Sequence, residues 1–184
     1  MLLCSDEELY REYLERGKQE ALRCLFDRYS EGLMLFLFGY VHSMEDAEEL
    51  MIDSFAEVAV GPTVFSGRSS FKTWLFSVGK HQALMFLRKR KREQLGTGSE
   101  ATETRSPELD LLSDERKQHL YLALERVADD YRMVLWLRYI EDMSIEEIAG
   151  IMKKRVKQIY NLTDRGKQAL KKELEKIGFE YEQI

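Results

Sequence analysis

Proline is almost absent from this chain, and that scarcity limits the possible folds more than any other feature. Only Pro62 and Pro107 occur among the 184 residues. Proline interrupts helices because it lacks the backbone N–H and its ring clashes with the preceding turn. In the long proline-free stretches, apolar residues recur at the i, i+3, i+4 spacing of amphipathic helices. The sequence therefore predicts an all-α protein.

Helix-capping residues predict where several of these helices begin and end. Ser5 followed by Glu8 forms a capping box, and Gly17 is expected to end the helix that starts there. Ser43 is expected to begin a later helix. Between these two helices, the apolar residues predict core helices with a break at 30–32, where serine and glycine interrupt the pattern.

The middle of the chain changes in composition. A long helix is expected to begin after Ser70 and to end in the basic run 88–92. The following residues are rich in glycine, serine and threonine and contain few apolar anchors, which is typical of a linker. We therefore expect two small helical domains, at 1–92 and 114–184, joined by a flexible linker at 93–113.

The second domain has the pattern of a helix-turn-helix. Ser144 and Glu147 form a capping box before a short apolar stripe, and a second stripe begins at Val156. The N-terminal half of the second helix of this motif contacts base edges in the major groove. The polar residues there are Lys157, Gln158 and Asn161. These side chains can hydrogen-bond to bases or phosphates, although an amphipathic helix exposing ordinary polar residues is the alternative.

The net charge of −5 conceals a strong alternation of charge along the chain. Residues 1–63, 96–147 and 173–184 carry −9, −7 and −3, whereas residues 64–95 and 148–172 carry +7 each. Two basic segments in an acidic protein predict two contacts with nucleic acid, and the acidic segments predict a contact with a basic protein surface. Solvated helix faces are the alternative explanation.

The first basic segment mixes aromatic and cationic residues. Single-stranded bases bind where a stacking surface lies beside a charged track for the phosphates. The aromatic candidates are Phe65, Phe71, Trp74 and Phe76, and the cationic ones are Arg68, Lys72, Lys80 and His81. Because several of these rings share a helix face with Val78, we expect at least two of them to be buried.

The sequence offers no constellation for catalysis. The histidines are isolated from one another, and no zinc-protease, serine-hydrolase or phosphate-loop motif occurs. The acidic residues at 46–53 are expected to form a protein-docking face, with a metal-dependent nuclease as the alternative. Cys4 and Cys24 lack metal-ligand spacing and are expected to be reduced thiols. With no apolar run long enough for a bilayer, we expect a cytoplasmic protein without cofactor or membrane insertion.

Several motifs resemble one family. Residues 46–55, residues 65–75 and the basic run at 88–92 resemble domain two of the extracytoplasmic-function (ECF) group of bacterial sigma-70 factors. Residues 134–139 followed by 143–149 are similar to domain four of the same group. The resemblance implies a non-enzymatic factor that binds RNA polymerase core, directs promoter-specific initiation and assists melting, with an anti-sigma factor as a further partner. The alternative is a two-domain helix-turn-helix regulator that does not program the polymerase.

The resemblance also assigns residues to three contacts. For binding of core polymerase they are Asp46, Glu48, Glu49, Met51 and Asp53. The loop at 64–70 would capture a flipped nontemplate base of the minus-ten element. The residues assigned to this element are Phe65, Ser66, Arg68, Ser69, Lys72, Trp74, Lys80, His81 and Arg88. For the minus-thirty-five element in double-stranded DNA they are Lys154, Arg155, Lys157, Gln158, Asn161 and Arg165.

The chain departs from the family pattern at a few positions. Lys153 and Lys154 occupy the helix-turn-helix turn, where the family often has glycine. Ile52 stands where the docking helix commonly has glutamine. Gly166 lies within a predicted helix, where alanine is more favourable by about 1 kcal/mol. The basic segments and the acidic face remain intact.

Overall fold

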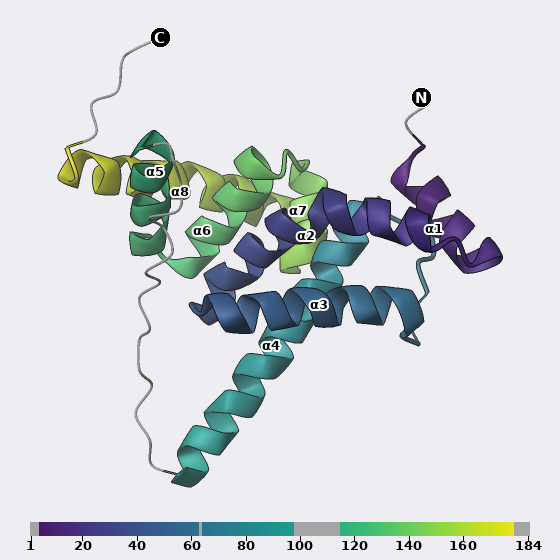
Figure 1. The fold of residues 1–184 in the computed structure, drawn as a ribbon. Helices are drawn as coiled ribbons and strands as arrows, with labels where there is room; N and C mark the ends of the chain where they lie inside the picture. The colour runs from purple at the N-terminus through teal and green to yellow at the C-terminus, as the bar shows by residue number, and fades with distance from the viewer. Residues whose placement is uncertain (1–3, 63, 98–114, 179–184) are drawn as a thin grey trace. The chain divides into compact units, whose positions relative to one another are not determined.

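The computed structural model describes residues 4–62, 64–97 and 115–178, and the regular structure in these ranges is helical (Figure 1). The elements are α1 (Asp6–Arg16), α2 (Gln19–Val41), α3 (Met44–Val60), α4 (Phe71–Thr97), α5 (Glu115–Arg126), α6 (Asp129–Leu135), the π-helical turn η2 (Trp136–Ile140), α7 (Ile145–Met152) and α8 (Val156–Lys176). Two compact units result, one containing α1 to α4 and the other α5, α6, η2, α8 and most of α7. The predicted all-α class with two small domains is confirmed.

Local capping determines the ends of α1, as predicted. The Ser5 hydroxyl accepts a hydrogen bond from the Glu8 backbone N–H at 3.2 Å, and the Glu8 carboxylate accepts one from the Ser5 N–H at 3.0 Å. Gly17 ends the helix at a φ of 64°, a conformation that glycine adopts without steric cost. The predicted start after Ser43 is also confirmed, because its hydroxyl accepts from the Asp46 N–H at 3.2 Å.

The predicted break at 30–32 is wrong, because α2 continues through these residues to Val41. A glycine inside a helix costs about 1 kcal/mol relative to alanine. Leu25 and Leu33 on either side are fully buried, and burying each such side chain contributes about 1.5–3 kcal/mol. Burial of the flanking apolar residues therefore outweighs the local cost of Gly32.

The core of the first unit lies among α2, α3 and α4, which pack against one another (Figure 1). Its largest buried side chains include Leu33, Phe36, Leu37 and Phe76. Gly79 lies where α4 packs against α2, and a Cβ there would lie 2.8 Å from Leu33 Cδ1. The absence of a side chain at position 79 therefore leaves room for Leu33 between the two helices.

Helix α4 extends beyond the basic run at which it was expected to end. It continues to Thr97, so the first residues of the predicted linker at 93–113 are helical. The rest of the predicted linker lies within residues 98–114, which are outside the described part of the chain. In the described ranges, none of the helices is both long and apolar enough to cross a membrane.

A buried arginine connects α5 and α6 in the second unit. Arg132 in α6 has 7% of its surface exposed. Its guanidinium donates hydrogen bonds to the carbonyl oxygens of Leu124, Glu125 and Val127 at 2.9, 3.0 and 3.2 Å. The first two carbonyls lie in the last turn of α5, where helical carbonyls lack intrahelical donors, and the third belongs to Val127 just after the helix. Burial lowers the pKa of Arg132 from its ordinary value, and the Asp129 charge opposes that effect.

Gly166 lets α8 lie close to α6. A Cβ at this position would lie 3.3 Å from Leu135 Cγ and 3.4 Å from Tyr131 Cβ, which is tighter than ordinary van der Waals contact. Ile159 and Thr163 are buried on the same side of α8. Close packing therefore accounts for a glycine in a position where helix propensity alone would favour alanine.

Candidate nucleic-acid and protein-docking sites

The predicted docking helix presents an acidic outer face. Glu48, Glu49 and Asp53 are exposed on α3, and Ile52 beside them has 52% of its surface exposed. Met51 lies on the opposite, inner face and is 6% exposed. Because its side chain is buried in the chain's own core, Met51 offers almost no surface to a partner. Four of the five predicted docking residues thus retain accessible carboxylates.

Asp46 differs from the other acidic residues because it is paired within the chain. Its Oδ2 lies 3.4 Å from Nη1 of Arg90, which belongs to the basic run of α4. Its carboxylate therefore links the start of α3 to α4 as well as bordering the acidic face. In the described ranges, no group of three or more His, Cys, Asp or Glu side chains could hold a metal ion.

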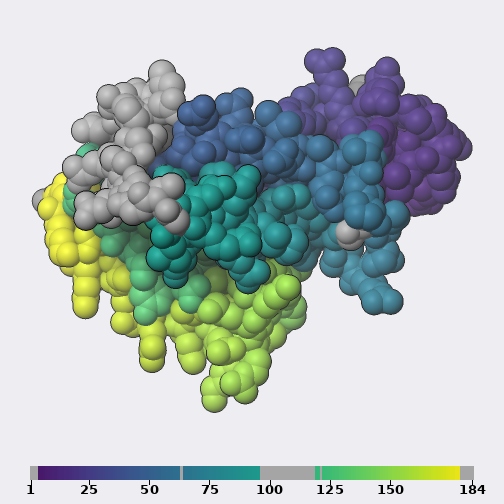
Figure 2. All heavy atoms as spheres, turned by 90° about the horizontal axis from the view of Figure 1, so that it is seen from below, coloured from purple at the N-terminus to yellow at the C-terminus, as the bar shows by residue number. Residues whose placement is uncertain are grey.

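The loop at 64–70, hereafter the 64–70 loop, combines exposed polar residues with one aromatic residue that packs against other rings. Ser66, Arg68 and Ser69 are exposed, and Gly67 adopts a φ of 70°. Phe65 instead packs inward, with its ring centroid 5.4 Å from that of Trp74. Figure 2 shows this segment, drawn in blue, projecting from the surface beside the purple α1. The loop therefore presents polar and cationic side chains from a base of packed aromatic rings.

Burial divides the predicted aromatic candidates. Phe71 and Phe76 are fully buried, so they belong to the core, as expected for at least two of the rings. Phe65 and Trp74 are half-buried and keep part of each ring accessible. Of the four aromatic candidates, these two have rings that a base could still reach.

Helical geometry separates the cationic candidates of α4. Trp74, His81 and Arg88 are seven residues apart and therefore share one face of the helix. Lys72 lies on the opposite side, with its Nζ 5.7 Å from the ring centroid of Tyr29 and 5.9 Å from that of Phe76. Lys80 lies between these faces. One face thus extends from the 64–70 loop to the basic end of α4.

The helix-turn-helix forms as predicted. The Ser144 hydroxyl accepts from the Glu147 N–H at 3.2 Å, and the Glu147 carboxylate accepts from the Ser144 N–H at 3.0 Å. Lys153 takes the left-handed conformation of the turn at a φ of 53°. Lys154 contacts α6, with its Nζ 2.9 Å from Asp130 Oδ2. A lysine in the position where the family often has glycine therefore still permits the turn.

The outer face of α8 carries the predicted minus-thirty-five residues. Arg155, Lys157, Gln158, Asn161 and Arg165 are all exposed. Gln158 also has a structural role, since its Oε1 accepts from the Arg155 N–H at 2.8 Å at the start of the helix. The amide nitrogen of Gln158 can still donate to a base.

Sequence reasoning missed Tyr160 on the edge of this face. It has 55% of its surface exposed, and it lies one helical turn after Lys157 and just before Asn161. Its ring is accessible to thymine methyl groups or sugars, and its hydroxyl to phosphates. An aromatic residue next to polar ones on the solvent side of an amphipathic helix was the signal that could have identified it.

Comparisons with known proteins identify the family. The model for sigma-70 region 2 matches residues 25–93, and the model for sigma-70 region 4 matches residues 117–170. The chain is 32% identical over 166 residues to the ECF RNA polymerase sigma factor SigX of Bacillus subtilis, covering 85% of each protein. It is 27% identical over 176 residues to the ECF RNA polymerase sigma-E factor of Salmonella typhimurium, covering 89% of this chain and 92% of that one.

A solved structure supports the same fold. The sigma factor RpoE of Bartonella quintana, solved in complex with the anti-sigma factor NepR, superposes with a TM-score of 0.73 at 21% identity. The superposition covers 83% of this chain and 96% of that one.

Regions 2 and 4 in one chain define the sigma-70 class of transcription factors. The chain belongs to the ECF family of RNA polymerase sigma factors. This membership favours a sigma factor over a regulator that does not program the polymerase.

Proposed function

We propose that this sigma factor uses three separate surfaces during initiation. The outer face of α3 binds core polymerase, the 64–70 loop and one face of α4 bind the melted minus-ten strand, and α8 reads the minus-thirty-five duplex. The observation that carries the proposal is the separation of charge on the described residues. Exposed carboxylates gather on α3, whereas exposed cations lie in the 64–70 loop (Arg68), at the basic end of α4 and on α8.

The chemistry of α3 suits a protein partner. Exposed carboxylates lie beside the exposed apolar side chain of Ile52, and protein interfaces commonly combine apolar and polar groups in this way. A polyanion would be repelled by Glu48, Glu49 and Asp53. This face is therefore proposed to bind a basic surface of the polymerase.

The 64–70 loop suits a single strand. Arg68 supplies a cation for the phosphates, and the serine hydroxyls can hydrogen-bond to a base edge. Flipping a base out of the duplex costs a few kcal/mol, which contacts in a pocket must offset. The half-buried rings of Phe65 and Trp74 lie where such a base could stack.

The outer face of α8 suits the major groove. Lysine and arginine can pair with guanine, and asparagine and glutamine can pair with adenine, so Lys157, Gln158 and Asn161 have the chemistry for sequence readout. Tyr160 is added to this proposed surface because of its exposure.

Further parts of the proposal rest on family membership. We propose that the chain acts in the cytoplasm, where it meets the polymerase, and that it has no catalytic activity of its own. The related sigma factor of Bartonella quintana is bound by an anti-sigma factor. By similarity, we propose that an anti-sigma protein binds this chain and holds it inactive.

Transcription in vitro tests the proposal. Purified core polymerase with this chain is expected to initiate at specific sites on a genomic fragment library, and run-off sequencing would locate them. DNA binding without any specific initiation would favour the regulator that does not program the polymerase. Metal-dependent cleavage of the template would favour the nuclease instead.

A charge reversal tests the docking surface. Glu49→Lys is expected to weaken binding of core polymerase by about tenfold, because it places a positive charge against the proposed basic surface of the polymerase. Glu31→Lys makes the same change at an exposed position on α2 and serves as the matched control. Equal affinity of both variants for core, measured by fluorescence titration, would remove α3 from the proposed interface.

A further inference from the structure

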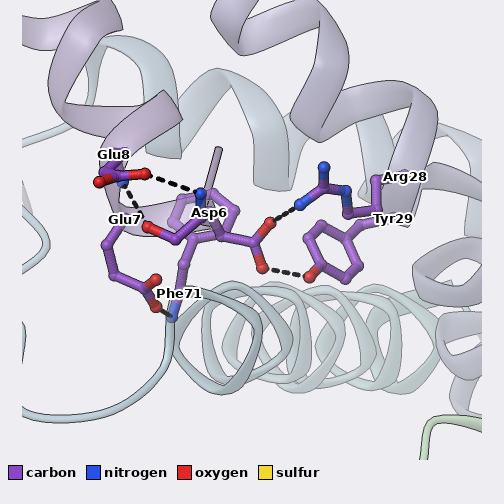
Figure 3. A network of polar contacts seen from close by, with 7 residues as sticks. Asp6, Glu7, Glu8, Arg28, Tyr29 and Phe71 are labelled. Atoms are coloured by element: carbon purple, nitrogen blue, oxygen red, sulfur yellow. Dashed lines mark hydrogen bonds and ion pairs between the residues drawn. The ribbon is translucent and has the colours of Figure 1, made fainter. Parts of the chain in front are cut away.

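The N-terminal helix α1 contacts the structural elements on both sides of the 64–70 loop. It precedes residues 25–93, which the region 2 model matches. Glu7 Oε1 accepts a hydrogen bond at 3.0 Å from the backbone N–H of Phe71, the first residue of α4 (Figure 3). The N–H groups of a first helical turn lack intrahelical acceptors, and the helix dipole favours an anion there. Glu7 therefore stabilises α4 at the point where the loop ends.

Tyr10 reaches the other side of the loop as well. Its ring is 3% exposed, and its centroid lies 5.2 Å from that of Phe71 and 5.5 Å from that of Trp74. It also meets Phe65 edge to face, with the centroids 6.1 Å apart. Its hydroxyl donates to the carbonyl oxygen of Val58 at 2.9 Å, in the last turn of α3. One side chain thus touches the helix before the loop, the loop itself and the helix after it.

The orientation of α1 is held by separate contacts with α2. Asp6 bonds to Arg28 and to the hydroxyl of Tyr29, both on α2 (Figure 3). The acidic residues of the first turn therefore have different partners: Asp6 binds α2, Glu7 binds α4, and Glu8 caps its own helix. These contacts hold Glu7 and Tyr10 against the base of the loop.

We propose that Glu7 and Tyr10 are positioning residues, which hold the 64–70 loop in its DNA-binding shape before DNA arrives. This inference rests on the proposed role of the loop in binding the minus-ten strand. A loop that is competent for only a fraction of the time binds with an apparent affinity reduced by that fraction. Fixing Phe65 and the first turn of α4 in advance therefore increases affinity without any contact between α1 and DNA.

Two disruptive variants and two conservative variants separate positioning from other effects. Glu7→Ala removes the acceptor for the Phe71 N–H, whereas Glu7→Gln keeps an acceptor oxygen. Tyr10→Leu removes the ring from the cluster, whereas Tyr10→Phe keeps it. Glu12→Ala is the matched control, because Glu12 lies on α1 but pairs with Lys18 at 2.7 Å instead of α4.

The first measurement is made on the full chain bound to core polymerase. The probe is a labelled single-stranded DNA about ten nucleotides long, selected by the wild-type holoenzyme from a randomised pool. Glu7→Ala and Tyr10→Leu are expected to bind it about tenfold more weakly, corresponding to a competent fraction of about one tenth. The conservative variants and Glu12→Ala are expected to stay within about twofold of wild type. The slope of log Kd against log salt should not change, because no phosphate contact is removed.

The second measurement needs no DNA. Backbone amides of residues 64–71 in the free full chain are expected to exchange with deuterium faster in Glu7→Ala and Tyr10→Leu than in the other variants. Wild-type exchange rates in both disruptive variants would overturn the inference. So would faster exchange with unchanged affinity, or a changed salt slope, which would indicate direct contact with DNA.

The proposed minus-ten function and the positioning role of α1 can be disproved separately. If the wild-type holoenzyme selects no sequence from the pool, the proposed minus-ten function fails, while the exchange data still test whether α1 orders the loop. If Tyr10→Leu loses core binding through unfolding, the comparison of Glu7→Ala with Glu7→Gln tests the positioning role by itself.

Discussion

Arg132 illustrates how one buried side chain can hold two helices together. Its three hydrogen bonds go to carbonyl groups at and just after the end of α5, where helical carbonyls lack intrahelical donors. The cost of burying a guanidinium is offset because these acceptors are fixed in place by the backbone. The residue therefore stabilises the second unit through geometry that depends on a planar, forked donor.

Replacing Arg132 is expected to destabilise the second unit strongly. Arg132→Met should lower the free energy of unfolding by about 3 kcal/mol, because it leaves buried carbonyl groups without donors. Arg132→Lys should not restore stability, because a single ammonium cannot reproduce the fork. Urea unfolding followed by Trp136 fluorescence, in a Trp74→Phe background, measures the loss. Arg126→Met, at an exposed position on α5, should change stability by less than about 0.5 kcal/mol.

Tyr29 predicts a loss of stability at alkaline pH. Burial raises the pKa of its phenol, and the hydrogen bond to Asp6 raises it further. Because tyrosine in the unfolded chain ionises near pH 10 while the folded phenol stays protonated, the unfolded state binds fewer protons above that pH. The stabilising contribution is therefore present below about pH 10 and decreases as the pH rises above it.

Urea unfolding of full-length variants between about pH 9 and about pH 11 measures this effect. The free energy of unfolding should fall less steeply for Tyr29→Phe than for wild type. Tyr160→Phe, which removes an exposed hydroxyl, is the matched control. Identical slopes for all three proteins would contradict the assignment to Tyr29.

At the scale of helices, glycine has opposite effects at two positions. Gly79 lies where α4 meets α2, against the fully buried Leu33. Gly150 is exposed on α7, and no atom outside its immediate surroundings lies within 4 Å of the Cβ it would carry. Helix propensity favours alanine at both positions, so packing decides the sign at Gly79.

Alanine substitution at each position tests this difference. Gly79→Ala is expected to lower the free energy of unfolding by about 1–2 kcal/mol, because the added methyl overpacks a filled core. Gly150→Ala is expected to raise it by about 0.5–1 kcal/mol through reduced chain entropy. Thermal and urea unfolding of the full chain measures both. A stabilising Gly79→Ala would show that α2 and α4 can separate at little cost.

At the scale of the whole molecule, the two basic surfaces belong to different compact units. Arg68 lies in the first unit and Lys157 in the second, with the residues at 98–114 between them in sequence. Contacts made from independent units contribute additively to binding. We therefore expect the two proposed DNA contacts to act separately.

A double-mutant cycle tests this independence. Arg68→Ala and Lys157→Ala should each weaken binding of holoenzyme to a promoter fragment containing both elements, by about 1–3 kcal/mol where a base contact is lost. Their combined effect should equal the total of the separate effects within about 0.5 kcal/mol. If Lys157 contacts only a phosphate, its substitution should instead weaken all sequences equally and reduce the salt slope by about 1. A larger coupling energy would show that the units bind DNA as one body.

The sequence by itself determined the features that depend on near neighbours. Capping boxes at Ser5 and Ser144 predicted helix starts correctly, because the bonds that define them join residues three positions apart. The helix-turn-helix and the all-α class followed from residue spacing in the same way, and the family was indicated by the resemblance of short motifs. The break at 30–32 failed because burial of Leu25 and Leu33 outweighed a local preference.

Only the tertiary structure decided which candidate side chains face solvent and which are enclosed. Periodicity assigns faces to a helix, but the partners on each face come from distant parts of the chain. Met51 is therefore buried while Glu49 is exposed on the same helix, and Phe65 turns inward while Arg68 stays outside. The bond from Glu7 to the Phe71 amide spans 64 positions. No local pattern predicts such a contact, because it exists only after α1 has packed against the unit that contains α4.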